Sequence, residues 1–193
     1  MNSENEQGVT GEELYRRFLQ GDNDAFHDLV ALYEDELSRF VHNIVSDYHD
    51  AKHITIESFA QLALSGGRFA GKSSLKTYLF AIGKNMAKRH MRKYGRIQHI
   101  PYEDIVKISN GRQDEGETPQ SLMESDENRR IIRKAMQELK DDHRIVLVLL
   151  HFEDMSYKQA AQAMGKTEKQ IKNLAYRAKH ALKKKLEDRG YAR

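Results

Sequence analysis

Basic and amide side chains near the C-terminus have the spacing needed to contact the major groove of DNA. Ser156 can cap a short helix, Ala161 is small enough for a second helix to cross closely, and Gly165 suits a sharp turn between them. Apolar residues then recur at steps of three and four, which buries one face of the second helix. The residues predicted to contact DNA are Thr167, Glu168, Lys169, Gln170, Lys172, Asn173, Tyr176 and Arg177. The pattern predicts a helix-turn-helix over residues 156–180.

The charge of this segment supports the same interpretation. From Lys166 to Lys185 there are eight Lys or Arg residues and one Glu, a net charge of +7. A solvated basic helix at the end of a bundle would carry a similar charge. It would not need the small, glycine and apolar residues at the positions that the motif requires.

A second basic segment lies in the N-terminal half. Residues 84–96 contain six basic residues and no acid, and aromatic residues are interleaved with the basic residues from 69 onward. Basic side chains bind phosphates and aromatic rings stack on bases, so the combination suits unpaired strands better than an intact duplex. For Tyr78, a place in the hydrophobic core is an equally good explanation.

Residues 66–73, GGRFAGKS, match the P-loop pattern G-x-x-x-x-G-K-S. A P-loop needs a buried parallel strand before its glycines. The preceding residues, HITIESFAQLALS, contain no fully apolar run, and Glu57 and Gln61 interrupt them at helical spacing. A nucleotide-hydrolysing enzyme is therefore a weak alternative. No catalytic constellation stands out elsewhere, so the sequence predicts a protein that is not an enzyme.

Periodicity over the rest of the chain predicts an all-α fold of two small helical domains. A short helix capped by Thr10, a long helix with an apolar stripe from Phe26 to Ile44, a third over about 50–64 and a fourth after Ser73 or Ser74 are expected in the first half. Apolar positions among 131–139 and 145–152 predict two helices before the helix-turn-helix. Nothing indicates a sheet.

The boundaries follow from composition. Residues 98–125 contain both prolines, Pro101 and Pro119, with glycines and many acids, which predicts a flexible acidic linker. We therefore expect a disordered N-terminus over 1–9, one domain over 10–97, the linker over 98–125 and a second domain over 126–188.

The composition of the 193 residues excludes several classes of site. There is no cysteine, hence no disulfide framework and no thiolate metal site. His49 and His53 are four residues apart but have no obvious third ligand, so we expect solvated histidines, no metal and no cofactor. The N-terminus is polar and acidic, and the longest apolar run, residues 145–150, is too short to span a bilayer. A cytoplasmic protein without membrane insertion is expected.

The order of these segments resembles the extracytoplasmic-function group of bacterial RNA polymerase sigma factors, of the sigma-70 class. GDNDAFHDLVALYEDEL resembles the start of the family's region 2, and RFAGKSSLKTYLFAIGKNMAKRHMRK resembles its Phe-x-Gly-x-Ser, Thr-aromatic-Leu and Ile-x-x-Asn pattern. The C-terminal half resembles region 4. The resemblance extends over about residues 10–188, with region 2 in 10–97 and region 4 in 126–188.

The resemblance implies a role for each region. Region 2 would bind the polymerase clamp through residues 50–62, then melt the minus-10 element and capture a flipped base in a pocket lined by Phe69, Ile82 and Asn85. Region 4 would read the minus-35 duplex with residues 167–177. The residues implied in minus-10 binding are Phe69, Lys72, Ser73, Ser74, Lys76, Thr77, Tyr78, Ile82, Lys84, Asn85, Lys88, Arg89 and Arg92. Those implied in polymerase binding are Asp50, Ile54, Glu57, Ser58 and Phe59, while Lys52, His53 and Ile56 depart from the family's usual acid, acid and glutamine.

The implied partners are core RNA polymerase, promoter DNA and an anti-sigma factor that holds the free protein inactive. The main alternative is a stand-alone helix-turn-helix repressor or activator. Such a regulator would bind its operator tightly without polymerase, whereas a sigma factor alone should bind DNA weakly.

Overall fold

The regular structure is helical throughout the part of the chain that the computed structural model describes, residues 9–94, 128 and 130–191. The N-terminal half contains α1 (Gly11–Leu19), α2 (Asn23–Val45), α3 (Tyr48–Leu64) and α4 (Leu75–Tyr94). The C-terminal half contains a helical stretch over 130–137, then α6 (Asp141–His151), α7 (Tyr157–Met164) and α8 (Glu168–Glu187). The all-α prediction is confirmed. The predicted linker, 98–125, and residues 1–8 of the predicted N-terminal tail lie outside the described residues.

Short polar side chains start the helices of the N-terminal half. The Thr10 hydroxyl accepts a hydrogen bond from the Glu13 amide at 3.3 Å, and the Asp22 and Asp47 carboxylates cap α2 and α3 in the same way. The cap predicted at Thr10 is confirmed, and Glu13 at the third helical position would allow a reciprocal capping box. Instead, the side chain of Glu13 pairs with Arg16, so only half of that box is present.

Helix α4 crosses α2 closely in the core of the N-terminal half. The rings of Phe40 and Phe80 lie 4.8 Å apart, and neither side chain is exposed. A Cβ at Gly83 would lie only 2.9 Å from Leu37 Cδ1, so a glycine permits the approach of the two helices. The predicted apolar stripe of α2 therefore faces α4.

The core of the C-terminal half is centred on residues 145–149 of α6, which are all buried. One expectation is wrong at its edge: Phe152, assigned to the helix, lies beyond its end and is 55% exposed. Ile132, one of the apolar positions that predicted the preceding helix, is 41% exposed. Helix α6 begins earlier than the apolar residues suggest, because its first turn is polar and contains Asp141 and Asp142.

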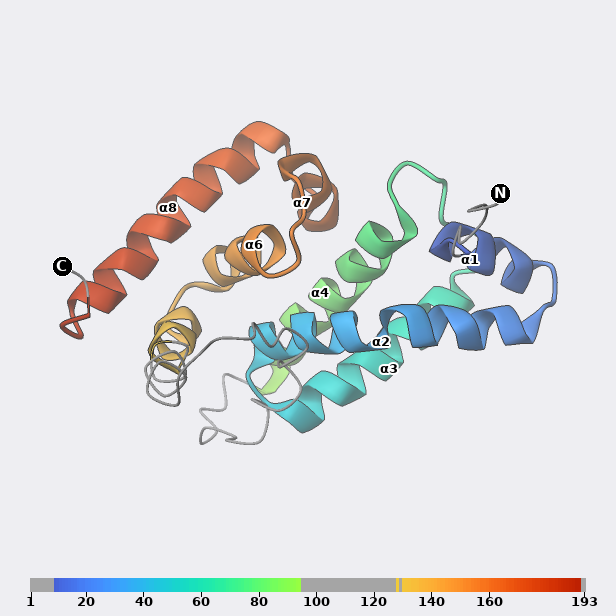
Figure 1. Cartoon of the computed structure of the whole chain (residues 1–193), viewed down its shortest axis with the longest axis horizontal. Helices are drawn as coiled ribbons and strands as arrows, with labels where there is room; N and C mark the ends of the chain where they lie inside the picture. The colour runs from blue at the N-terminus through green and yellow to red at the C-terminus, as the bar shows by residue number, and fades with distance from the viewer. Residues whose placement is uncertain (1–8, 95–127, 129, 192–193) are drawn as a thin grey trace, which may run out of the picture.

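The two halves pack directly against each other, which the sequence did not predict. Helix α4 packs against α2 and α3 on one side and against α7 on the other, while α6 packs against α2 (Figure 1). Buried apolar side chains from both halves form one continuous cluster. The C-terminal half therefore covers part of the basic helix α4, and we call this arrangement closed.

Candidate nucleic-acid interface

The helix-turn-helix has the local geometry that its sequence predicts. The Ser156 hydroxyl accepts from the Gln159 amide at 3.2 Å while the Gln159 side chain accepts from the Ser156 amide at 2.8 Å. Thr167 and Gln170 form the same reciprocal capping box at the start of α8. Gly165 takes a φ of 63° between the helices, a conformation that favours glycine.

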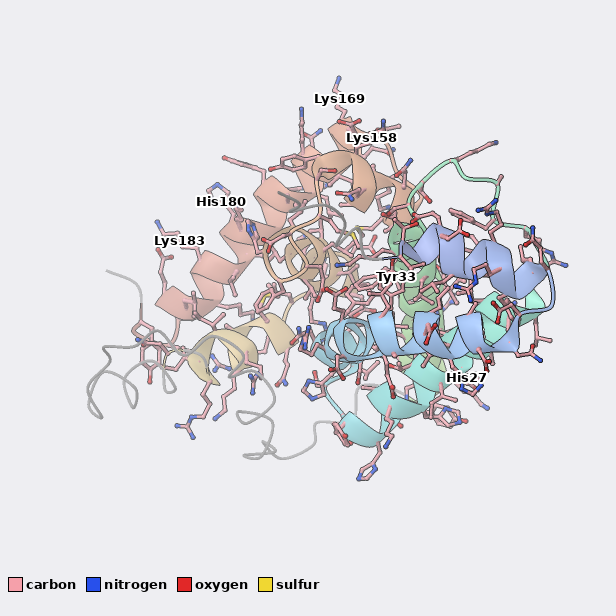
Figure 2. All side chains as sticks on the ribbon, turned by 45° about the vertical axis from the view of Figure 1, so that its right-hand side comes forward. His27, Tyr33, Lys158, Lys169, His180 and Lys183 are labelled. Atoms are coloured by element: carbon pink, nitrogen blue, oxygen red, sulfur yellow. The ribbon has the colours of Figure 1, made fainter. Side chains whose placement is uncertain are left out.

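Every residue that the sequence assigned to DNA contact on α8 is exposed. The exposed residues are Thr167, Glu168, Lys169, Gln170, Lys172, Asn173, Tyr176 and Arg177, while Ile171, Leu174, Ala175 and Ala178 are buried. The side chain of Lys169 projects away from the molecule at the start of α8 (Figure 2). The structure thus leaves one polar face of this helix available to a ligand.

Further residues missed by the sequence reasoning extend this face. The His180 ring lies 4.4 Å from the ring of Tyr176, one helical turn earlier. Lys158 of α7 and Lys183 of α8 also project outward (Figure 2). The sequence does indicate that His180 belongs to this face, because it follows Tyr176 by four residues, a spacing that places two side chains on the same side of a helix.

The residues predicted to bind an unpaired strand separate onto two faces of α4. Tyr78, Ile82, Asn85, Arg89 and Arg92 recur at steps of three and four, so they form one line along the helix. The first two are partly buried and the other three are exposed. We call these five residues the open stripe.

The base pocket expected around Asn85 is not assembled in the closed arrangement. Asn85 is exposed, whereas Ile82 and Phe69 are partly buried. The Phe69 ring packs against Tyr78, with 5.4 Å between ring centres, two helical turns from Asn85. Of the remaining residues predicted before and within the first turn of α4, Lys72 and Ser74 are exposed, Ser73 and Lys76 are partly buried, and Thr77 is buried.

The other face of α4 is occupied by the C-terminal half. Lys84 is only 8% exposed, and its Nζ donates to the backbone carbonyl of Ala163 at 2.9 Å. Burial lowers the pKa of Lys84 below its ordinary value, and the nearby positive charge of Lys88 adds to that effect. Lys84 therefore holds the C-terminal half in the closed arrangement.

Asp142 of α6 is the centre of a charged cluster at the same interface. Its carboxylate accepts from Lys88 Nζ at 2.7 Å and lies 3.6 Å from Lys166 Nζ. The hydrogen bond from Lys88 lowers the pKa of Asp142, and the positive charges of Lys88 and Lys166 act in the same direction. A further link joins the Gln162 side chain to the Lys72 carbonyl at 2.8 Å.

Glu153, which follows α6, faces charged residues of the N-terminal half. Burial raises its pKa from 4.5 to about 7. The charges of Glu36 and Asp154 also raise this pKa, while those of Lys76 and Arg39 lower it. Glu36, Arg39 and Lys76 belong to the N-terminal half, so part of the surroundings of Glu153 lies across the interface. Separation that exposes Glu153 to solvent would return its pKa toward 4.5.

We expect closure to weaken as the pH rises from about 4.5 to about 7. The closed arrangement binds a proton at Glu153 in this window and the separated halves do not, which favours closure at the acidic end by at most about 3 kcal/mol. Fluorescence energy transfer between labelled halves measures the change. Glu153→Gln should stay closed at pH 8 and lose this component of the pH profile, whereas the control Asp154→Asn should keep it. An unchanged profile in Glu153→Gln would contradict the assignment.

The structure corrects the residues predicted to bind polymerase. Ile54, Ser58 and Phe59 are 1%, 0% and 5% exposed, so they support α3 from inside and offer no surface. Asp50 lies 2.9 Å from His90 of α4, and only Glu57 of the predicted set is exposed. The exposed face of α3 instead consists of His49, Lys52, His53, Ile56, Glu57, Ala60, Gln61 and Leu64.

The structure also bears on the nucleotide-binding alternative. Helix α3 ends at Leu64 and is followed by Gly66 and Gly67, so a helix, not a parallel strand, leads into the glycines. Within the described ranges, no group of three His, Cys, Asp or Glu residues is placed to hold a metal ion. No helix of that part of the chain is both long and apolar enough to cross a membrane.

Comparisons with known families match both halves. The model for sigma-70 region 2 matches residues 29–97, and that for sigma-70 region 4 matches residues 129–182. The RNA polymerase sigma-H factor of Pseudomonas aeruginosa is 29% identical over 183 residues, which covers 91% of this chain and 93% of that protein. The ECF RNA polymerase sigma-E factor of Haemophilus influenzae is 29% identical over 185 residues, with 93% and 96% covered.

Two solved structures share the fold. CnrH, in complex with the cytosolic domain of CnrY, superposes with a TM-score of 0.66 at 19% identity and covers 91% of this chain and 96% of its own. The sigma factor RpoE, in complex with the anti-sigma factor NepR from Bartonella quintana, gives a TM-score of 0.63 at 22% identity, with 84% and 96% covered. The expected similarity of fold is confirmed.

Proposed function

This chain belongs to the extracytoplasmic-function group of sigma-70 factors, and from that membership we propose which of its residues contact the promoter and the polymerase. As an alternative sigma factor it binds core RNA polymerase and directs initiation at specific promoters. The family consists of initiation factors without enzymatic activity of their own, so RNA synthesis is the chemistry of the polymerase.

We assign reading of the minus-35 duplex to the exposed face of α8. The observation that supports this most strongly is the helix-turn-helix. Capping boxes start both of its helices, and the first residues of α8 are exposed. Lys172, Asn173 and Arg177 supply donors for base edges or phosphates, and Lys169 adds charge near the start of the helix. Gln170 has a positioning role, because its side chain accepts from the Thr167 amide.

Binding of the melted minus-10 strand is assigned to the open stripe of α4. Arg89 and Arg92 would hold phosphates, and Asn85 has the donor and the acceptor needed to read a base edge. Phe69 and Tyr78 supply aromatic surface at the start of the helix, where an unpaired base can stack. Lys84 and Lys88 join this surface only after the C-terminal half has moved away.

Docking on the polymerase is assigned to the exposed face of α3. Ile56 is 58% exposed and Leu64 is 81% exposed, so this face combines apolar side chains with the charges of Lys52 and Glu57. An exposed apolar patch with a polar rim is typical of a protein interface. The buried residues Ile54, Ser58 and Phe59 would fix its shape.

The halves must separate for both DNA elements to be bound at once. The minus-10 and minus-35 elements lie about 25 base pairs apart, which is about 85 Å of duplex. A compact chain of this length has a radius of gyration of only about 16 Å. The closed arrangement therefore represents the free or inhibited sigma factor, and we propose that an anti-sigma factor stabilises it.

The two DNA-reading surfaces should fail in different ways. Lys172→Ala or Arg177→Ala should weaken holoenzyme binding to a minus-35 duplex, by about 1–3 kcal/mol where a base contact is lost. Asn85→Ala should spare that duplex but impair opening of the minus-10 region, because the base it holds must first leave the stack. Run-off transcription with core polymerase, permanganate footprinting and a duplex binding assay separate these effects.

Two outcomes would count against the assignment. Intact melting in Asn85→Ala, with melting lost in Lys72→Ala or Lys76→Ala, would show that the N-terminal half acts through backbone charge alone. Nanomolar operator binding by the free chain, with no association with core polymerase, would favour a stand-alone regulator.

A further inference from the structure

Helix α1 lies outside the residues matched by the region 2 model, which begin at position 29. It nevertheless contacts the loop over residues 65–74, which joins α3 to α4 and carries Phe69 (Figure 1). Gly66 and Gly67 give this loop positive φ angles of 52° and 81° at its start. Glycines are conformationally permissive, so local sequence alone does not fix the course of the loop.

The first tie between α1 and this segment is made by Glu12. Its carboxylate accepts a hydrogen bond from the backbone amide of Leu75 at 2.7 Å. Leu75 is the first residue of α4, where helix amides have no partner within the helix. The Ser74 hydroxyl accepts from the Thr77 amide at 3.2 Å. The start of α4 is therefore capped twice, once locally and once by a side chain 63 residues earlier.

The second tie is made by Tyr15, which is 2% exposed. Its hydroxyl lies 3.0 Å from Ser65 Oγ and donates to the carbonyl of Leu62 at 3.2 Å, which fixes the end of α3. The edge of its ring meets the ring of Phe69, with 6.2 Å between centres and 78° between planes. Tyr15 thus joins the start of the loop to the aromatic side chain that the loop presents.

We propose that Glu12 and Tyr15 are positioning residues for minus-10 recognition. They hold both ends of the loop, and so place Phe69 beside Tyr78 at the start of the open stripe. A loop free to move would have to be ordered when the strand binds, and that entropic cost would weaken binding. This inference rests on the proposed role of the open stripe.

The test compares three single variants in holoenzyme assembled with core polymerase. Glu12→Ala removes the acceptor, Glu12→Gln keeps an acceptor without the charge, and Glu13→Ala removes a charge from the same helix away from Leu75. One readout is binding of a single-stranded oligonucleotide that carries the minus-10 sequence. The second is hydrogen exchange of the Leu75 amide in the full-length free chain.

We expect Glu12→Ala to weaken oligonucleotide binding about fivefold, which corresponds to one capping hydrogen bond. It should also accelerate exchange at Leu75. Glu12→Gln should be close to wild type in both readouts, as should Glu13→Ala. Tyr15→Phe removes only a hydroxyl and should weaken binding about twofold or more, and it serves as the test if Glu12→Ala folds poorly.

Several results would overturn the proposal. If Glu12→Ala and Glu12→Gln both bind the oligonucleotide more tightly than wild type and by the same factor, Glu12 acts only by repelling DNA through its negative charge. If Glu12→Ala accelerates exchange of the Leu75 amide without weakening oligonucleotide binding, Glu12 only caps α4 and has no positioning role. The proposed function is tested separately by Asn85→Ala. If Asn85→Ala weakens oligonucleotide binding and Glu12→Ala does not, only the positioning role fails. If neither weakens it, the open stripe itself is wrongly assigned.

Discussion

Joining the two halves with a short cleavable crosslinker should abolish promoter-specific transcription, and cleaving the crosslinker should restore it. The chain has no cysteine, so Lys88→Cys and Asp142→Cys introduce a single reactive pair. These positions suit the test because the Lys88 and Asp142 side chains meet at 2.7 Å across the interface. A crosslinked chain stays closed, and it cannot span about 85 Å of promoter. Run-off transcription before and after reduction measures the effect.

The controls separate the effect of holding the halves closed from the effect of modifying the cysteines. Each single-cysteine variant, treated with the same reagent, should transcribe as well before reduction as after it. The reduced double variant sets the reference activity, because it has lost both the ion pair that favours closure and the Lys88 charge assigned to DNA binding. Full activity of the crosslinked double variant would show that the closed arrangement already supports initiation.

Asp142→Lys should open the free chain. The substitution removes the partner of Lys88 and Lys166 and adds a positive charge beside them and Lys84. Two partly exposed ion pairs contribute about 0.2–1 kcal/mol each, and repulsion of similar size replaces them, so we expect a shift of about 1–3 kcal/mol toward separation. Small-angle scattering should show a larger radius of gyration, most clearly at low salt.

A charge swap provides the matched control. Lys88→Asp combined with Asp142→Lys restores an opposite pair across the interface and should return the chain toward its compact size. Thermal melts followed by circular dichroism show whether each half remains folded. If the single and double variants have equal dimensions, the cluster around Asp142 does not hold the halves together.

Features that depend on neighbouring residues could be predicted from the sequence. The helix-turn-helix, including its exposed face, could be predicted because its stabilising contacts are local. Each contact joins residues within about four positions of one another, as at Ser156, Gly165 and Thr167. The fourth helix was likewise predicted to begin after Ser73 or Ser74, and it begins at Leu75.

Contacts between distant segments could not be predicted in this way. Lys84 lies at helical spacing from the buried Phe80 and Ala87, but the sequence does not show that it contacts Ala163 while Arg89 stays exposed. The difference arises because α7 packs on one face of α4 and not on the other. The capping of Leu75 by Glu12 also requires knowledge of how α1 and α4 meet.

The error on α3 has a different origin. Ile54, Ser58 and Leu62 are spaced four residues apart, so periodicity alone places them on one inward stripe. The family resemblance implies polymerase contacts at Ile54, Ser58 and Phe59, but it does not indicate which face of the helix is buried. Helical periodicity would have selected Ile56, Glu57 and Ala60, which the structure exposes.

The interface between the halves also sets how well this sigma factor competes with others for a limited supply of polymerase. If only the separated chain binds promoter and polymerase, its apparent affinity for polymerase is proportional to the fraction of open molecules. That affinity falls about tenfold for each 1.4 kcal/mol of free energy that favours closure. Lys84 binds a backbone carbonyl, which substitution of Ala163 would leave in place. Substitutions at Asp142, which is not assigned to DNA, can therefore change how well this factor competes for polymerase while the residues that read promoter sequence stay unchanged.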